Sequence, residues 1–352
     1  MKATLKGLVR TAAITGGLEA SHLISRLGTF RAARGLGAVF TLHHVRPCSP
    51  RPFAANGHLE VTPGFLDAAI RRLKAEGYRF LALDDVVALR GISTDGSPFA
   101  VFTLDDGYRD NAEHALPVFE RHGVPFTVFV TKGFSERSHT MWWETAEALL
   151  NATDKFTIET DCGPITHKVE TLAAKRAVFG EFSQAICGPH ESLAITRLDA
   201  AARSVGIDPA AIVADLVMTA EELQALARHP LAHLGAHTIS HRALDFLGDA
   251  ELLSELSGSA DYVEALVGHR PRSLAYPYGD QRSATRRVAT LAARAGFTLA
   301  VTTRASTIDK DTLAEPLLLP RISLNGLYQK PRYVAALASG IPFRLVGRAT
   351  AG

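Results

Sequence analysis

The sequence predicts an α/β fold in which helices cover a parallel sheet. From Gly37 onward, short runs of β-branched and aromatic residues alternate with helical stretches, which is the pattern of strands joined by crossover helices. Chemically reactive side chains follow directly after several of these runs. Hydrophobic residues make up 47% of the 352-residue chain, which is ample for a large buried core.

The first part of the pattern contains four strands in regular succession. Apolar and β-branched runs predict these strands at 37–42, 79–83, 99–104 and 124–130. Thr62-Pro63 is a helix start signal, so a helix is expected from there to about Glu76. A short helix is expected up to Arg90, and another over 111–122.

The alternation breaks between about 135 and 230. This stretch carries Trp142-Trp143-Glu144, an alternating run near Phe156-Thr157-Ile158, and alanine-rich helical segments without strong core strands. We interpret it as a mainly helical insertion placed over a scaffold. The pattern then resumes, with strands expected at 231–236, 273–276, 297–301 and 317–322 and helices at 250–267, 284–295 and beyond Pro331.

Charge and cysteine content exclude several classes of function. Thirty-eight basic and thirty-six acidic side chains leave a net charge of +2, without the block of lysines and arginines typical of nucleic-acid binding. We therefore expect no nucleic-acid partner. The three cysteines, Cys48, Cys162 and Cys187, are widely spaced, which indicates neither a disulfide framework nor a zinc knuckle.

The first residues resemble a signal peptide only superficially. Lys2, Lys6 and Arg10 precede an uncharged stretch, but Gly16-Gly17 and Glu19 interrupt any apolar segment. No apolar run approaches the roughly eighteen residues that a transmembrane helix needs. We expect a cytoplasmic protein without a transmembrane segment. Export, or attachment to a membrane surface through an amphipathic N-terminal helix, remains an alternative.

Two adjacent carboxylates follow the strand predicted at 99–104. Asp105-Asp106-Gly107 places two negative groups in one small volume, where they repel each other unless a cation or a proton holds them together. His237 and His241 follow the strand at 231–236, and two histidines four apart on a helical turn face the same side. Neutral imidazole binds zinc and similar ions well, so these residues together predict a metal site.

Three further elements lie at predicted strand ends. The turn Tyr276-Pro277-Tyr278-Gly279 can aim a backbone N–H into a pocket, although an ordinary turn with two packed tyrosines explains it as well. His43 follows the first strand, and Arg321 lies in a late one. In a (β/α) barrel the carboxyl ends of the strands meet on one face, which carries the active site. All these residues would meet there.

Three of these stretches together resemble the motifs of the polysaccharide deacetylases, the NodB-homology family, carbohydrate esterase family 4. Thr103-Leu104-Asp105-Asp106-Gly107 resembles the first motif, T-F-D-D-G, with Leu in place of Phe. His237-Thr238-Ile239-Ser240-His241 fits the second, H-[ST]-x-x-H, and Tyr276-Pro277-Tyr278-Gly279 resembles the end of the third. The resemblance covers roughly residues 37–325.

The resemblance implies a distorted (β/α)7 barrel, here with a mainly helical insertion. The chain then divides into an N-terminal helical segment (1–36), the barrel (37–325, with the insertion at about 135–230) and a C-terminal helix and tail (326–352). The family removes N-acetyl, sometimes O-acetyl, groups from sugars with one divalent metal, usually zinc. Carried over by position, Asp105 is the general base, the N–H of Tyr278 binds the oxyanion, and the metal ligands are Asp106, His237 and His241.

Two departures from the family motifs matter. Ala275 stands where many members have an arginine, and we expect Arg321, or as a second candidate Arg272, to orient the base instead. Many members take their acid from a late histidine, but no histidine follows His269. A branch similar to bacterial poly-N-acetylglucosamine deacetylases uses an early Y-H-x-V element, which Leu42-His43-His44-Val45 matches except for Leu. His43 is therefore the expected acid, with His44 as the alternate.

The expected activity is that of a hydrolase that removes N-acetyl groups from oligo- or polysaccharides containing N-acetylglucosamine and releases acetate, as a chitooligosaccharide deacetylase does. The alternatives are a polysaccharide O-acetyl esterase and a non-catalytic glycan-binding barrel. Tyr276, Pro277 and Trp143 are the expected sugar contacts, and tryptophan rings such as those of Trp142 and Trp143 can stack on a sugar. The competing interpretation is that Trp142 and Trp143 pack the insertion onto the barrel.

Overall fold

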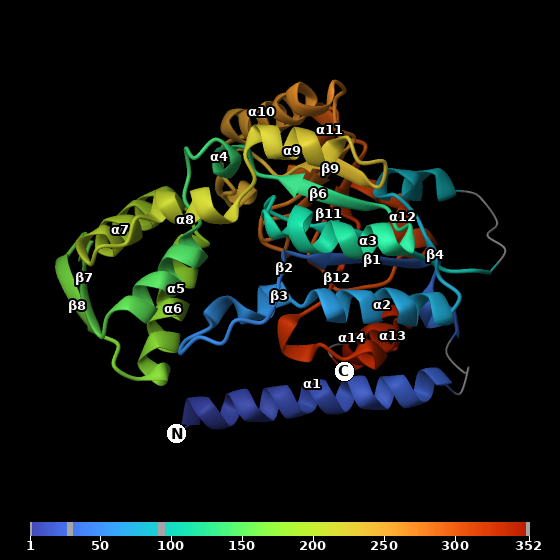
Figure 1. Ribbon diagram of the computed structural model, residues 1–352, viewed down its shortest axis with the longest axis horizontal. Coiled ribbons are helices and arrows are strands. Elements are labelled where there is room, and N and C mark those ends of the chain that lie inside the picture. Colours follow the sequence, from blue (N-terminus) through green and yellow to red (C-terminus); the bar gives the residue numbers. More distant parts are fainter. Residues whose placement is uncertain (1, 27–30, 91–95, 350–352) are drawn as a thin grey trace.

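The computed structural model describes residues 2–26, 31–90 and 96–349 (Figure 1). It begins with one long helix, α1 (Lys2–Arg26), which lies along the outside of the protein beside two C-terminal helices, α13 (Pro331–Ala338) and α14 (Ile341–Ala349). Glu19 of α1 pairs with Arg332 of α13, with 2.6 Å between the carboxylate and the guanidinium. None of the helices in the described ranges is both long enough and apolar enough to cross a membrane.

The centre of the fold is a parallel sheet, as predicted. Its strands lie in the order β11-β10-β9-β6-β5-β1-β12, and the short strand β4 (Arg79–Phe80) pairs beside β5. The central strands β1 and β5 are wholly buried, which explains their unbroken apolar sequences. The seven strands on this path are β1 (Gly37–Leu42), β5 (Phe99–Leu104), β6 (Phe126–Val130), β9 (Ala232–Ala236), β10 (Ser273–Ala275), β11 (Leu299–Val301) and β12 (Ile322–Ser323).

One short segment touches both edges of this sheet. Leu319 forms a parallel bridge with Val301 on β11, while Ile322 pairs with Phe40 on β1. The sheet therefore curls until segment 319–323 connects its two edges. This arrangement confirms the predicted distorted (β/α)7 barrel.

Helices cover the outside of the sheet. α2 begins as Thr62-Pro63 predicts: Pro63 takes the first helical position, and the Thr62 hydroxyl accepts a hydrogen bond from the Phe65 N–H at 3.2 Å. Phe102 on β5 packs against Phe119 of α3, so the apolar face of the helix joins the main core. The covering helices are α2 (Pro63–Ala75), η3 (Leu83–Leu89), η4 (Asn111–Ala115), α3 (Leu116–His122), α9 (Ala220–Ala227), α10 (Asp249–Val267), α11 (Arg286–Arg294) and α12 (Lys310–Ala314).

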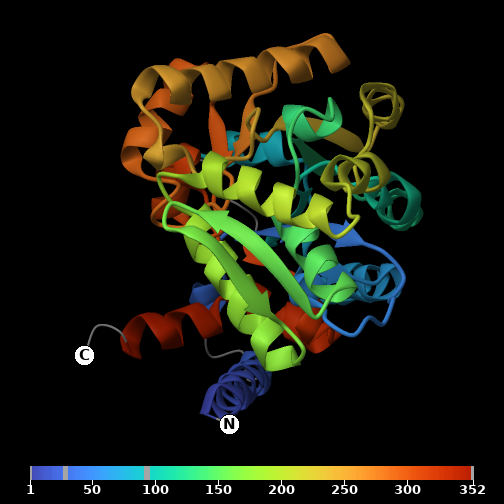
Figure 2. The same cartoon turned by 90° about the vertical axis from the view of Figure 1, so that its left-hand side faces the viewer.

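The insertion has its own hydrophobic core. It is mainly helical, as predicted, and the alternating run near Phe156 forms one strand of a hairpin. In Figure 1 the insertion lies at the end of the barrel toward which β6 points, and in Figure 2 it crosses in front of the barrel. Its elements are α5 (Trp142–Ala152), β7 (Lys155–Thr160), β8 (Gly163–Lys168), α6 (Leu172–Ile186), α7 (Glu191–Ser204) and α8 (Pro209–Leu216). The following helix α9 packs Leu223 and Leu226 into the main core instead.

Two predicted strands are wrong over most of their length. Residues 316–318 form a 3-10 helix that begins at Pro316, so the late strand shrinks to Ile322–Ser323. The second strand ends at Phe80, because Leu83 already starts a 3-10 helix with Asp84 and Asp85 in its first turn. Short elements also line the strand ends: β2 (His44–Val45), η2 (Ala55–Leu59), β3 (Glu60–Val61) and α4 (Lys132–Ser135).

Candidate active site

The two aspartates after β5 point in different directions. Both are almost fully buried, and Asp106 has a backbone φ of 74°, followed by Gly107 at 73°. This left-handed turn is uncommon for a residue other than glycine, although aspartate tolerates it. It directs Asp105 toward Arg321 and Asp106 toward His237 and His241, whose Nε2 atoms lie 3.5 and 3.4 Å from the Asp106 Oδ1 atom.

The two histidines meet through a loop and not through the predicted helical turn, which is wrong. Thr238 and His241 both have left-handed φ angles, 65° and 59°. The Nδ1 atom of His237 donates to the carbonyl of Ala275 at 2.7 Å, so its Nε2 atom is left to face Asp106. Glu255 of α10 fixes the loop, because its carboxylate accepts from the N–H groups of Ile239 and Ser240 at 2.8 and 2.9 Å.

Asp106, His237 and His241 fit a divalent ion. One potential ligand atom from each lies within 4.8 Å of the other two, and within the described ranges no other group of three does so. The Asp106 Oδ1 atom is buried without a hydrogen-bond partner. Burial and the neighbouring Asp105 charge raise the pKa of Asp106 well above its usual value. The pKa rises because the surroundings hold too little positive charge to compensate the ionised carboxylate. Two imidazoles and one carboxylate suit zinc and similar metals.

Asp105 has a partner of its own. Arg321, which is fully buried, donates from Nη1 and Nη2 to the two carboxylate oxygens at 2.7 Å each, and its Nε donates to the carbonyl of Thr302 at 3.0 Å. Burial alone would raise the pKa of Asp105, but the charge and hydrogen bonds of Arg321 outweigh it and hold this pKa well below its usual value. Asp105 is therefore ionised at neutral pH.

Arg272, the second candidate for orienting the base, does not lie near Asp105, and that expectation is wrong. Arg272 precedes β10 at the amino end of the strand, where it lines a different cavity together with Asp84 and His233. Asp105 lies at the carboxyl ends of the strands. Arg321 reaches it because segment 319–323 connects the two edges of the sheet.

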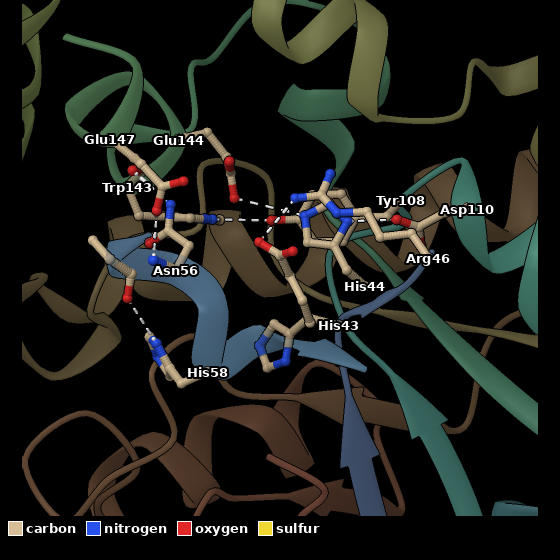
Figure 3. Close-up of polar contacts among 12 residues, drawn as sticks. His43, His44, Arg46, Asn56, His58, Tyr108, Asp110, Trp143, Glu144 and Glu147 are labelled. Atoms are coloured by element: carbon tan, nitrogen blue, oxygen red, sulfur yellow. Dashed lines mark hydrogen bonds and ion pairs between the residues drawn. The ribbon is translucent and has the colours of Figure 1, made fainter. Parts of the chain in front are cut away.

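His43 and His44 have different surroundings (Figure 3). His44 is fully buried, its Nδ1 lies 2.5 Å from the Asp110 carboxylate, and its Nε2 lies 3.6 Å from Glu144. Burial would lower the pKa of His44, but the two carboxylates raise it to about 9. His43 is partly exposed and lines the cavity above Asp105, whereas His44 does not. Burial lowers the pKa of His43 to about 4, so its ring is neutral at pH 7.

A cavity of about 390 Å³ opens over Asp106, His237 and His241, which we call the ligand group. Of the expected sugar contacts, Tyr276 and Trp143 line it, but Pro277 does not. The indole N–H groups of Trp142 and Trp143 donate to the hydroxyls of Tyr278 and Tyr108 at 3.1 and 2.9 Å. Both tryptophans line the cavity but are largely buried, so they mainly pack the insertion onto the barrel. Its lining residues are Thr41, His43, Asn56, His58, Leu59, Asp105, Asp106, Trp142, Trp143, Phe179, Ser183, His237, His241, Tyr276, Tyr278, Thr303 and Ser323.

The turn after β10 is held by the insertion. Tyr278 has a left-handed φ of 60°, and its hydroxyl donates to Glu191 of α7 at 2.7 Å. Glu191 also accepts from the N–H of Ala243 at 2.9 Å. The sequence carries no local signal for Glu191 or for Glu255, because each acts on a loop distant in the chain.

Glu191 gives the fold a measurable pH dependence. Burial raises its pKa to about 7, above the model-peptide value of 4.5, so the folded protein binds an extra proton between these values. The free energy of unfolding should therefore fall by up to about 3 kcal/mol as the pH rises from 5 to 8. In Glu191→Gln this part of the decrease should disappear, as measured by urea denaturation at both pH values. Glu181→Gln, on exposed Glu181 of α6, is the control and should retain it.

This site is typical of a metal-dependent hydrolase. It combines a barrel, a three-residue ligand group and a separate ionised carboxylate. A family model described as polysaccharide deacetylase matches residues 93–172 and 196–300, more than half of the chain. The chain therefore belongs to the polysaccharide deacetylase family, and the resemblance of its motifs is confirmed. Residues 173–195, in the insertion, lie outside the match.

Solved structures share the fold. The Streptococcus pyogenes deacetylase PplD, in complex with acetate, is 17% identical with a TM-score of 0.57, and the alignment covers 85% of this chain and 96% of PplD. IcaB from Ammonifex degensii is also 17% identical, with a TM-score of 0.53 and coverage of 88% and 98%. No curated protein sequence matches the chain significantly.

Proposed function

We propose that this deacetylase is a metal-dependent N-deacetylase that hydrolyses the acetamide of N-acetylglucosamine-containing glycans and releases acetate. One observation carries the proposal: an ionised carboxylate, Asp105, held by Arg321, lies beside a separate three-ligand group in one cavity. A glycan-binding barrel would need the cavity, but it would not need one aspartate in a ligand group and an adjacent ionised aspartate outside that group.

Each residue then has a distinct task. Asp106, His237 and His241 would hold the ion, for which we propose Zn²⁺; when bound, it supplies a Lewis acid that lowers the pKa of water and polarises the acetyl carbonyl. Asp105 accepts the proton of the attacking water, whose oxygen bonds to the carbonyl carbon. The N–H of Tyr278 donates to the carbonyl oxygen as it gains negative charge.

The leaving amine needs a proton when the C–N bond breaks, and we propose that His43 delivers it. His43 lines the cavity, whereas His44 is buried between two carboxylates. Since His43 is neutral in the free protein, it must first take up a proton, and the proton that Asp105 removes from water is the available source. This assignment fits the early-histidine layout of the poly-N-acetylglucosamine branch, which stays a prediction.

Acetate release tests the proposal directly. The purified protein should release acetate from at least one of chitooligosaccharides, poly-N-acetylglucosamine and peptidoglycan fragments. A chelator should abolish the release, and added Zn²⁺ should restore it. If zinc-loaded protein releases no acetate from any of these glycans, the proposed function is wrong.

Ester hydrolysis is the second candidate function, because it depends less on a proton from His43. An alkoxide leaves more readily than an amine and depends less on an acid. His43→Gln should therefore lower kcat for an N-acetylated substrate by about 10²–10⁴-fold but have a much smaller effect on an O-acetylated one. His269→Gln, which changes an exposed histidine that does not line this cavity, is the control. Equal losses on both substrates would remove His43 from the role of acid.

A further inference from the structure

The cavity over the ligand group is walled by parts of the chain that do not belong to the barrel. Strand ends form its floor, whereas η2 supplies Asn56, His58 and Leu59. Helix α6 adds Phe179 and Ser183, both from residues 173–195, the stretch without a match in the family model. A glycan chain can cross the site only if two of these walls leave a gap between them.

The gap between η2 and α5 is closed by buried polar contacts (Figure 3). The Asn56 N–H donates to Glu147 at 2.6 Å, and the Asn56 side-chain amide donates to the carbonyl of Trp143 at 2.9 Å. Asn56 is 1% exposed and Glu147 5%. Beside them, Asn151 accepts from the Phe53 N–H at 3.1 Å and donates to the Phe53 carbonyl at 2.8 Å. We call this boundary the η2–α5 seam.

A second boundary of the cavity is closed as well. Trp142 and Glu191 of the insertion both hydrogen-bond the hydroxyl of Tyr278, which joins the insertion to the turn after β10. Phe179 of α6 packs against Trp142 and Phe53, with ring centroids 5.7 and 6.2 Å apart, and continues the wall between these two sides.

The remaining lining residues show where the cavity reaches solvent. Three of them are exposed, His58, Thr303 and Ser323, and they come from η2, the loop after β11 and β12. Their side chains are polar and suit a hydrated glycan. The cavity volume of about 390 Å³ is near the lower end of the roughly 300–1,000 Å³ typical of small-molecule sites. The contacts thus close the cavity at two boundaries, and its exposed polar lining lies elsewhere, at His58, Thr303 and Ser323.

We propose that this pocket takes one acetylated sugar at the end of a chain and excludes acetylated sugars within a chain. The inference rests on the proposed function and specifies its substrate class: short oligosaccharides, or larger molecules that carry a terminal N-acetylated sugar. The terminal ring occupies the pocket with its acetyl group toward Asp105, and the rest of the substrate leaves past His58, Thr303 and Ser323.

The products formed from a fully acetylated chitohexaose test this inference. The wild-type protein with Zn²⁺ should release one acetate per chain, and mass-spectrometric sequencing should place the free amine at a single chain end. With poly-N-acetylglucosamine, the rate should follow the concentration of chain ends and not that of acetyl groups. Free amines at internal positions, or several per chain, would overturn the inference while leaving the proposed deacetylase function intact. No release from any glycan would overturn both.

A variant that opens the η2–α5 seam sharpens the test. Glu147→Ala removes the acceptor of the Asn56 N–H, so internal free amines should appear among the products. Glu181→Ala changes an exposed carboxylate of α6 and should keep the products terminal. Circular dichroism would show whether Glu147→Ala folds. If it folds and still gives terminal products only, the η2–α5 seam is not what excludes sugars within a chain. If it fails to fold, the products of the wild-type protein still test whether only terminal sugars are deacetylated.

Discussion

Asp105→Asn should abolish acetate release without loss of metal, whereas Asp106→Asn should lose metal affinity. The two carboxylates are adjacent in sequence but have different partners. Both oxygens of Asp105 accept from Arg321, while the Asp106 Oδ1 atom has no hydrogen bond and lies 3.4 Å from the Nε2 atom of His241. Removal of a general base costs about 10²–10⁴-fold in rate, so Asp105→Asn should leave at most about one hundredth of wild-type turnover.

Zinc content after dialysis and the rate of acetate release should be measured on both variants. Asp105→Asn should keep one zinc ion per chain, and Asp106→Asn should hold less at the same free zinc concentration. Asp110→Asn, which changes the carboxylate beside His44, is a control for a charge lost near the site but outside the ligand group. Equal metal loss in the Asp105 and Asp106 variants would contradict the division between base and ligand.

Arg321→Ala should destabilise the protein by about 3–5 kcal/mol, since it leaves the buried charge of Asp105 without a partner. In the wild type, Arg321 holds the pKa of Asp105 below its unfolded value, so the stabilisation by this pair is present at neutral pH and is lost at strongly acidic pH. In the variant, burial raises the pKa of Asp105. Protonation then relieves the penalty, so the difference from wild type should be largest at pH 7 and smaller at pH 4.5.

Urea denaturation of wild type, Arg321→Ala and Arg321→Lys at both pH values checks this prediction. Lysine keeps the positive charge but cannot make two parallel hydrogen bonds to the carboxylate, so Arg321→Lys should be intermediate. Arg304→Ala, on a partly exposed arginine of the same region, should change stability less and without this pH dependence. A pH-independent loss in Arg321→Ala would show that the lost packing, and not the Asp105 charge, controls stability.

The sequence predicts well those structural elements whose signal lies within a few neighbouring residues. The buried strands at 37–42 and 99–104 are continuous apolar runs, and their bounds are as expected. The strand at 317–322 is wrong over most of its length because Pro316 starts a 3-10 helix, and because a segment that connects two sheet edges pairs only a few residues with each. The turn over 237–241 is wrong because two left-handed residues bring the histidines together, and histidine spacing alone does not reveal backbone conformation.

The candidate site shows the same limit. The aspartates and histidines stand out because they follow strands, and the structure does bring them together. The carboxylates of Glu144, Glu147 and Glu191 act from the insertion on distant parts of the chain, and each occurs in an ordinary helical sequence. His43 and His44 cannot be told apart by position, because their difference lies in Asp110 and Glu144, which are far from them in the sequence.

The Asp105–Arg321 pair spans 216 residues of chain. During synthesis Asp105 emerges long before Arg321, and until then its carboxylate lacks the partner that keeps it ionised inside the folded barrel. Segment 319–323 is also the segment that connects the sheet edges, so closure of the barrel and the pairing of Asp105 depend on the same residues. A contact of such long range carries a large loop-closure cost, which is repaid only when the segment docks. A chain in which segment 319–323 has not docked would keep Asp106, His237 and His241 but lack the partner that orients Asp105, so the proposed catalysis requires a closed barrel.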